Sequence, residues 1–145
     1  MRPSIVCASL LALFCAGGAF GAEKKIVSPP HTKPGGNYSQ GILIGGTLYI
    51  SGQGGEDAAG NIPNDFDVEV RQCLENIGAV LKAGGMSPAD VVSVQVYITD
   101  AAKFQRMNAV YTSYFEDPRP TRTTVEVAGL LGRGVLRLPL LPGNR

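Results

Sequence analysis

The 145-residue chain contains no tryptophan, one histidine and three cysteines. Cys7 and Cys15 lie in an apolar N-terminal segment, so Cys73 is the only thiol in the rest of the chain. A single thiol cannot form an internal disulfide. One histidine, His31, together with one cysteine is too small a set for a zinc site or a Ser-His-Asp triad. Because Cys73 falls in a helical pattern, we interpret it as a buried structural thiol.

The sequence also lacks an excess of charge of either sign. It has 13 basic and 12 acidic residues, and without Arg2 the numbers are 12 and 12. A neutral chain offers no electrostatic attraction to nucleic acid or to an anionic membrane surface. We therefore expect neither as a partner.

The apolar run at the N-terminus is too short to span a bilayer. Residues 5–16 form a run of 12, whereas a transmembrane helix needs about 20. Arg2 precedes the run and the small residues of "GGAFGA" follow it, which is typical of a secretory signal peptide. We therefore predict a signal peptide at 1–22 and a single domain at 23–145 of an exported protein, periplasmic or secreted. The alternatives are a lipoprotein signal that ends at Cys15, an uncleaved anchor and a misassigned start.

The remainder of the chain shows alternating strand and helix patterns after a Pro- and Gly-rich, irregular segment, residues 23–40. Gly45-Gly46 between two apolar runs predicts a hairpin, and apolar residues spaced four, three and four apart predict a helix. In chain order, the predicted elements are strands 42–44 and 47–51, a helix at 66–83, a strand at 91–99, a helix at 101–116 and two strands within 120–138. This order indicates an α+β fold, a mixed sheet with two helices packed on one face.

Apolar residues are also expected on the sheet face that lies away from the helices. A small domain with two helices cannot cover both faces, so we expect a homo-oligomer that buries the second face. The second helix carries an aromatic stripe, which we interpret as core packing. Its members are Phe104, Met107, Tyr111, Tyr114 and Phe115.

Arg122 lies among strand-forming residues in "PTRTTVEVAGLLGRGVLRL", residues 120–138. Strand alternation places Arg122, Thr124 and Glu126 on the same face. A charged side chain in such a place needs a partner or a ligand. Glu126 or an acid across an interface could pair with Arg122, but the planar guanidinium is also suited to bind a carboxylate ligand bidentately.

Several segments, in order, resemble the RidA family, also called YjgF and formerly endoribonuclease L-PSP. They are "GNYSQG", "LYISGQ", "VRQCLENIGAVLKAGGMSPADVVSVQVYITD", "FQRMNAVYTSYF" and "PTRTTVEVA", within residues 26–130. The resemblance implies a chorismate-mutase-like homotrimer with its sheets inward, its helices outward and its active sites in the clefts between subunits. It implies hydrolysis of enamines and imines, such as 2-iminopropanoate and 2-iminobutanoate, to 2-oxo acids and ammonia, without cofactor or metal. The neutral charge and the lack of a basic-aromatic stripe argue against a ribonuclease.

The resemblance also assigns roles to six residues. Arg122 is implied to hold the substrate carboxylate, and the backbone of Thr124 to orient substrate and water. The residues expected to line the cleft are Tyr38, Ser51, Gln53 and Asn108. Each of these four also has a structural interpretation, because loop tyrosines pack, helix asparagines bond locally and "SGQ" is typical of a strand end.

The chain departs from the family pattern at Arg137, where a glutamate acts on the hydrolytic water and the leaving nitrogen. A carboxyl group can transfer these protons, but an arginine cannot. Three hypotheses stay open. The chain is a deaminase in which water is positioned by the Thr124 backbone, or a non-catalytic protein that binds small carboxylates or acts in stress protection. In the third, the end of the chain from about residue 137 arises from a shifted reading frame.

Overall fold

The computed structural model describes residues 22–30, 36–131 and 136–142. Within the last range it describes the course of the backbone. The predicted signal peptide, apart from Ala22, lies outside the described residues, and so does His31. No helix within the described ranges is long and apolar enough to cross a membrane.

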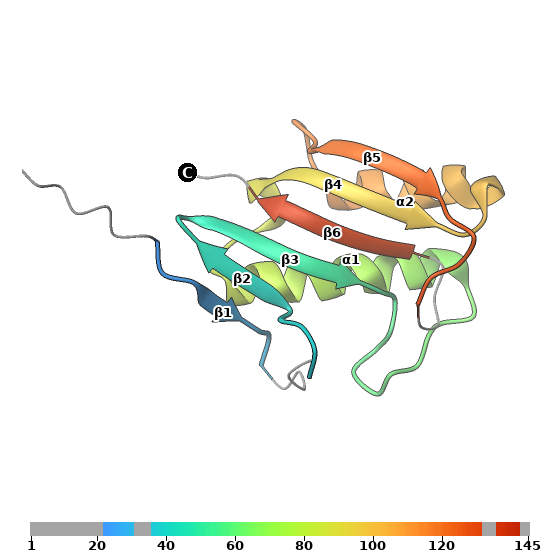
Figure 1. Cartoon of the computed structure of the whole chain (residues 1–145). Coiled ribbons are helices and arrows are strands. Elements are labelled where there is room, and N and C mark those ends of the chain that lie inside the picture. Colours follow the sequence, from blue (N-terminus) through green and yellow to red (C-terminus); the bar gives the residue numbers. More distant parts are fainter. Residues whose placement is uncertain (1–21, 31–35, 132–135, 143–145) are drawn as a thin grey trace, which may run out of the picture.

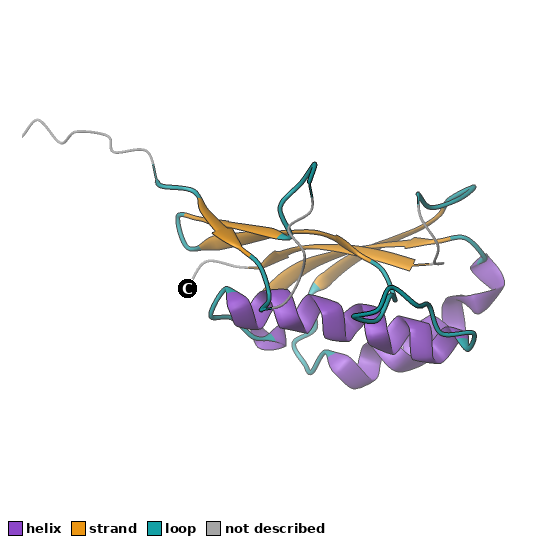
Figure 2. Cartoon of the chain, turned by 90° about the horizontal axis from the view of Figure 1, so that it is seen from below, coloured by secondary structure: helices purple, strands orange, loops and turns teal. Residues whose placement is uncertain are grey.

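The described chain forms a six-stranded sheet with two α-helices on one face (Figures 1 and 2). The strands are β1 (Lys25–Val27), β2 (Gly41–Ile44), β3 (Thr47–Gln53), β4 (Val91–Ile98), β5 (Thr121–Glu126) and β6 (Leu136–Pro142). The helices are α1 (Phe66–Ala83) and α2 (Phe104–Tyr114), with short 3-10 turns at Pro88–Asp90 and Ala101–Lys103. The predicted α+β class and the two helices on one face are confirmed. The short strand β1 was missed, because three residues beside a Pro- and Gly-rich stretch carry too little pattern.

The strand order is β1-β2-β3-β6-β4-β5. β4 and β5 are parallel and α2 connects them, while the other neighbouring pairs are antiparallel. Of the two strands predicted within 120–138, β5 lies inside that range, whereas β6 begins there and continues to Pro142. β4 lies between them in the sheet (Figure 1). The last strand of the chain is thus a central strand of the sheet.

The ends of α1 and the turn of the hairpin follow directly from local sequence. The carboxylate of Asp65 accepts hydrogen bonds from the backbone N–H groups of Asp67 and Val68, at 2.9 and 3.1 Å. This side chain therefore caps the helix N-terminus. Between β2 and β3, Gly45 and Gly46 have φ angles of +56° and +80°. Two successive positive φ angles are typical of the tight turns that join antiparallel strands, and glycine adopts them without strain.

The core lies between the helices and the sheet. Helix positions spaced as predicted are fully buried, and β4 contributes Val94, Val96 and Ile98. Regular alternation would place Val92 on the same face, but Val92 is 50% exposed because the pairing of β4 with β6 is irregular between Val91 and Ser93. Cys73 is buried, and its thiol donates a hydrogen bond to the carbonyl oxygen of Gln53 at 3.1 Å. The structural interpretation of this thiol is confirmed.

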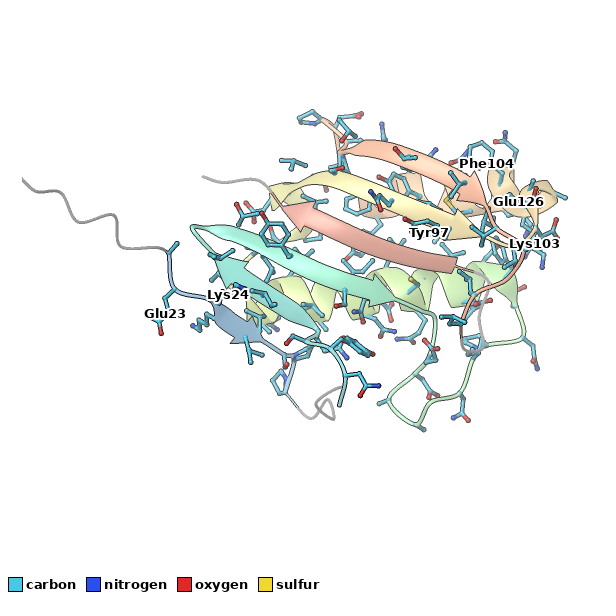
Figure 3. All side chains as sticks on the ribbon, in the orientation of Figure 1. Glu23, Lys24, Tyr97, Lys103, Phe104 and Glu126 are labelled. Carbon is cyan, nitrogen blue, oxygen red and sulfur yellow. The ribbon has the colours of Figure 1, made fainter. Side chains whose placement is uncertain are left out.

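The sheet face away from the helices carries apolar and aromatic side chains in two rows. One row runs across three strands through Ile26, Ile42 and Tyr49, and Ile26 and Tyr49 are 70% and 49% exposed. Tyr97 and Val125 are paired in the second row, and Tyr97 lies on the open side of the sheet in Figure 3. Nothing in the described chain covers this face (Figure 2).

Candidate functional site

Arg122 lies on β5, the edge strand of the sheet, and its side chain is directed toward α2. The guanidinium carbon is 4.6 Å from the centroid of the Tyr111 ring and 5.7 Å from that of Phe104. Both distances fall within the range of cation–π contacts. Arg122 is half-buried, while Tyr111 is 97% buried, since its exposed fraction is 3%. The arginine thus rests on an aromatic surface that belongs to the core.

Within the described part of the chain, the guanidinium of Arg122 makes no hydrogen bond and no salt bridge. The possible partner on the same face, Glu126, instead accepts a hydrogen bond from the backbone N–H of Ala101 at 2.9 Å. Figure 3 shows Glu126 at the end of β5, near the start of α2. The neighbouring cations Arg119 and Arg106 are bound to aspartates. The hydrogen-bond donors of Arg122 are therefore available to a ligand.

Three buried polar atoms at the meeting of β5 and α2 have no hydrogen-bond partner among the described residues. They are Oγ1 of Thr124, the hydroxyl oxygen of Tyr111 and Oδ1 of Asn108. Thr124 follows Arg122 by two positions on the same side of β5, and Asn108 lies one turn before Tyr111 on α2. Buried polar groups are nearly always paired. The strand that carries Arg122 and the helix that contacts it thus both hold buried polar atoms whose hydrogen-bonding capacity is unused by the described residues.

The charge state of Tyr111 is set by its surroundings. Burial raises the pKa of the phenol above its ordinary value, although the nearby cations Arg122 and Arg119 act in the opposite direction. The ring that contacts the guanidinium is neutral at physiological pH, as a tyrosine ordinarily is, and burial favours that state further.

The other predicted site residues form a separate group near the end of β3. Ser51 donates a hydrogen bond from Oγ to the carbonyl oxygen of Ser39 at 2.6 Å. The amide of Gln53 donates to Gln40 Oε1 at 3.0 Å and to the carbonyl oxygen of Ser51 at 2.9 Å. These bonds hold the loop that carries Tyr38, whose side chain is 57% exposed. Ser51 and Gln53 thus perform the structural role that sequence analysis left as their alternative.

A surface cavity of about 430 Å³ lies beside this loop. Tyr38 and Gln53 line it, together with Asn76 of α1, which donates hydrogen bonds to the carbonyl oxygens of Gly54 and Glu56 at 2.8 Å. The cavity offers both acceptors and donors, and it includes none of the residues on β5 or α2.

Within one chain, the six predicted site residues are not brought together. β6 and β4 lie between β3 and β5, and neighbouring strands are about 4.8 Å apart, so β3 and β5 are separated by about 14 Å. Arg122, Thr124 and Asn108 form one group, and Tyr38, Ser51 and Gln53 form the other. Sequence analysis missed this division because it could not place β6.

Arg137, at the position of the expected glutamate, is paired with Tyr97 of β4 in the central strand β6. Although Pro139 cannot donate a ladder hydrogen bond, β6 pairs with β3 on both sides of it, at Leu138 and Leu140, with an irregular register. The proline is therefore accommodated by a local break in regular pairing.

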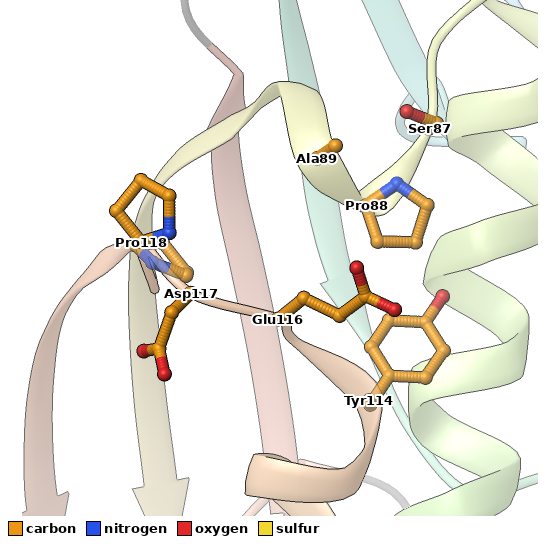
Figure 4. Close-up of a pocket in the computed structure, with 8 residues that line it drawn as sticks. Ser87, Pro88, Ala89, Tyr114, Glu116, Asp117 and Pro118 are labelled. Atoms are coloured by element: carbon orange, nitrogen blue, oxygen red, sulfur yellow. The ribbon is translucent and has the colours of Figure 1, made fainter.

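A second cavity, of about 350 Å³, lies where β4 and β5 begin (Figure 4). Tyr114, Glu116 and three prolines contribute to its walls, and none of the six predicted residues does. Within the described ranges, no group of three or more His, Cys, Asp or Glu side chains is placed to hold a metal ion.

The two aromatic residues that hold Arg122 were not predicted as part of a site. Sequence analysis assigned Tyr111 and Phe104 to the core, and the exposures confirm that role for Tyr111. The available signal was an aromatic stripe on the helix directly before the strand that carries an isolated arginine.

Comparisons with known proteins match residues 29–136 to the family model described as Endoribonuclease L-PSP. A RutC family protein of Sulfurisphaera tokodaii is 45% identical over 100 residues, which are 68% of this chain and 80% of that protein. The 2-iminobutanoate/2-iminopropanoate deaminase of Bos taurus is 41% identical over 97 residues, 66% of this chain and 71% of the deaminase. The chain is also similar to E. coli TdcF, whose crystal structure was solved with bound serine. The two sequences are 34% identical, and the structures align with a TM-score of 0.76 over 83% of this chain and 99% of TdcF.

The unpaired hydroxyl of Thr124 leads to a prediction about stability. Thr124→Val removes a buried polar atom without a partner and keeps the side-chain shape, so we expect the melting temperature to be unchanged or higher. Thr121→Val on the same strand removes the hydrogen bond from Oγ1 to the carbonyl oxygen of Val92, 2.9 Å long. We expect that variant to lose up to about 1 kcal/mol of unfolding free energy. Thermal and urea unfolding measure the stability of both variants. If Thr124→Val and Thr121→Val lose the same unfolding free energy, the Thr124 hydroxyl is hydrogen-bonded in solution.

Proposed function

This chain belongs to the Endoribonuclease L-PSP family, also called the RidA or YjgF family, and we propose that it hydrolyses imines and enamines of small 2-amino acids. The substrates would be of the 2-iminopropanoate and 2-iminobutanoate class, and the products 2-oxo acids and ammonia. One observation carries the proposal: the half-buried guanidinium of Arg122 has no counter-ion among the described residues. The name of the bovine relative supports the reaction, and the serine bound to TdcF supports a small ligand with a carboxylate.

The role of Arg122 follows from its chemistry. A guanidinium stays charged when it loses water, and two of its N–H groups can donate to the two oxygens of one carboxylate. With Tyr111 beside it and its N–H donors unused by the described residues, Arg122 would bind the substrate carboxylate through those donors. This contact would hold the adjacent C=N carbon at a defined position beside Thr124.

Hydrolysis adds water to the C=N carbon and expels the nitrogen as ammonia. The nitrogen must gain protons while the attacking water loses them. The backbone of Thr124 would orient the water. The proton transfers would involve solvent, because an arginine such as Arg137 stays protonated at neutral pH and cannot accept or donate protons. We therefore expect slower hydrolysis than a carboxyl group at position 137 would allow.

We further propose that three chains assemble through the open sheet face, with their helices outward. Two observations support this. Apolar rows with Ile26, Tyr49 and Val125 are exposed on that face, and a single chain keeps Tyr38 apart from Arg122. In an assembly, Tyr38 of one chain and Arg122 of the next would form one cleft. We propose export across a membrane as well, on the N-terminal pattern of residues 1–22.

A second candidate is a non-catalytic protein that binds small carboxylates in the same cleft. It is favoured by Arg137, which occupies the central strand where the family pattern has a glutamate. In that case the carboxylate anchor Arg122 is kept, while the group that transfers protons is lost.

Substitution of Arg122 tests the proposed reaction. We expect Arg122→Ala to lower kcat/KM for 2-iminopropanoate by at least about 100-fold, since two charge-assisted hydrogen bonds are lost. Arg122→Lys keeps the charge but not the bidentate geometry, so its kcat/KM should lie between those of the wild type and Arg122→Ala. The imine is generated in situ by an amino acid oxidase, and its loss is followed by competition with semicarbazide. If the wild type does not hydrolyse the imine faster than buffer alone, the proposed deaminase activity is wrong.

Arg137→Glu separates the two candidate functions. If proton transfer limits a weak deaminase, the new carboxyl group should raise kcat about tenfold or more, within the usual range for general acid–base catalysis. The control is Arg119→Glu, an exposed arginine whose partner is Asp117. A wild type that binds 2-oxobutanoate, seen as a raised melting temperature, but hydrolyses no imine supports the binding protein.

The assembly is tested by light scattering. We expect three chain masses for the wild type. Tyr49→Glu places a charge on the open face and should dissociate the assembly, whereas Val68→Glu places it on α1. The two residues are a matched pair, 49% and 50% exposed on opposite sides of the domain. A wild type of one chain mass would contradict the trimer, and dissociation by Val68→Glu alone would place the interface on the helices.

A further inference from the structure

Arg122 lies over the ring of Tyr111, and that ring packs against Phe115 in the core. Its guanidinium carbon is 4.6 Å from the Tyr111 ring, whose centroid is 4.8 Å from that of Phe115. Phe115 and Tyr111 are 1% and 3% exposed. The ring beneath the arginine is thus fixed by core packing.

An arginine on an edge strand would otherwise be mobile. Its side chain carries about 2 kcal/mol of rotamer entropy, and within the described chain no hydrogen bond or ion pair restrains the Arg122 guanidinium. Stacking on a ring restrains the plane of the guanidinium without using any of its N–H donors. An acidic partner would hold the side chain equally well but would compete with an anionic ligand.

We propose that Tyr111 is a positioning residue whose ring orders the guanidinium of Arg122 for a carboxylate ligand. This inference rests on the proposed function of Arg122 as a carboxylate anchor. Phe104 contacts the guanidinium from farther away, at 5.7 Å, and is only partly buried. Tyr111 is therefore the principal contact, and its loss should raise KM and the dissociation constant of a carboxylate while kcat stays nearly constant.

The ring, rather than the hydroxyl group, carries this role. The hydroxyl oxygen of Tyr111 is buried and has no hydrogen-bond partner within the described residues, so it does not contribute a bond to the guanidinium. Burial also raises the pKa of the phenol, which keeps the ring uncharged. Phenylalanine at this position should therefore replace tyrosine fully.

Three substitutions on α2 test the inference. Tyr111→Leu removes the ring, and we expect KM for 2-iminopropanoate and Kd for 2-oxobutanoate to rise about tenfold, as for loss of a desolvated cation–π contact. Tyr111→Phe should stay within about twofold of the wild type. The matched control is Tyr114→Leu, which removes a half-buried aromatic ring of the same helix with no contact to Arg122. Equal effects of Tyr111→Leu and Tyr114→Leu would reduce the role of Tyr111 to general packing and overturn the inference.

A readout that needs no ligand separates this inference from the proposed function. In ¹H–¹⁵N spectra, the Nε–H signal of Arg122, assigned by its loss in Arg122→Ala, should show a ring-current shift in the wild type and Tyr111→Phe. It should lose this shift in Tyr111→Leu. If the wild type neither hydrolyses the imine nor binds 2-oxobutanoate, the proposed function fails and this signal decides the inference. An Arg122 signal that is the same in all three proteins overturns it.

Discussion

The sheet depends on β6, which pairs with β3 on one side and with β4 on the other. Without it, the hairpin half β1–β3 and the β4–β5 half have no shared ladder. A central strand satisfies backbone groups along both of its edges, so its pairing limits where every other element can lie. This pairing places about 14 Å between β3 and β5, and it divides the residues of the predicted site into two groups.

The one-sided placement of the helices has consequences for both stability and function. The helix-facing residues of β3 and β4, such as Leu48 and Val96, are fully buried, whereas Tyr49 between buried neighbours is half-exposed on the open face. Burial of such exposed apolar rows against another surface is favourable, because it removes apolar area from water. Within a chain, β6 and β4 separate the loop that carries Tyr38 from Arg122 on β5. Assembly through the open face would bury these apolar rows, which supports the proposed trimer.

The region around Arg122 combines a rigid aromatic support with unused hydrogen-bond donors. Arg119 and Arg106 bind aspartates, but Arg122 contacts rings. This arrangement suits an anionic ligand, since no acid of the described chain competes for the guanidinium. In the proposed function, Arg137 would affect a different property, the supply and removal of protons. Carboxylate binding and imine hydrolysis would then depend on different residues, so binding could persist where hydrolysis is weak.

Local sequence was sufficient for the elements whose determinants are close together in the chain. The span of α1, its cap at Asp65 and the Gly45-Gly46 hairpin follow from side-chain spacing, capping bonds and backbone freedom, all of which act over a few residues. The isolation of Arg122 among strand residues was also evident. Only the tertiary structure decided that β6 enters between β3 and β4, that Glu126 binds Ala101, and that Tyr111 supports Arg122. Each of these depends on contacts between segments far apart in the chain, and alternation within one strand does not specify its neighbour.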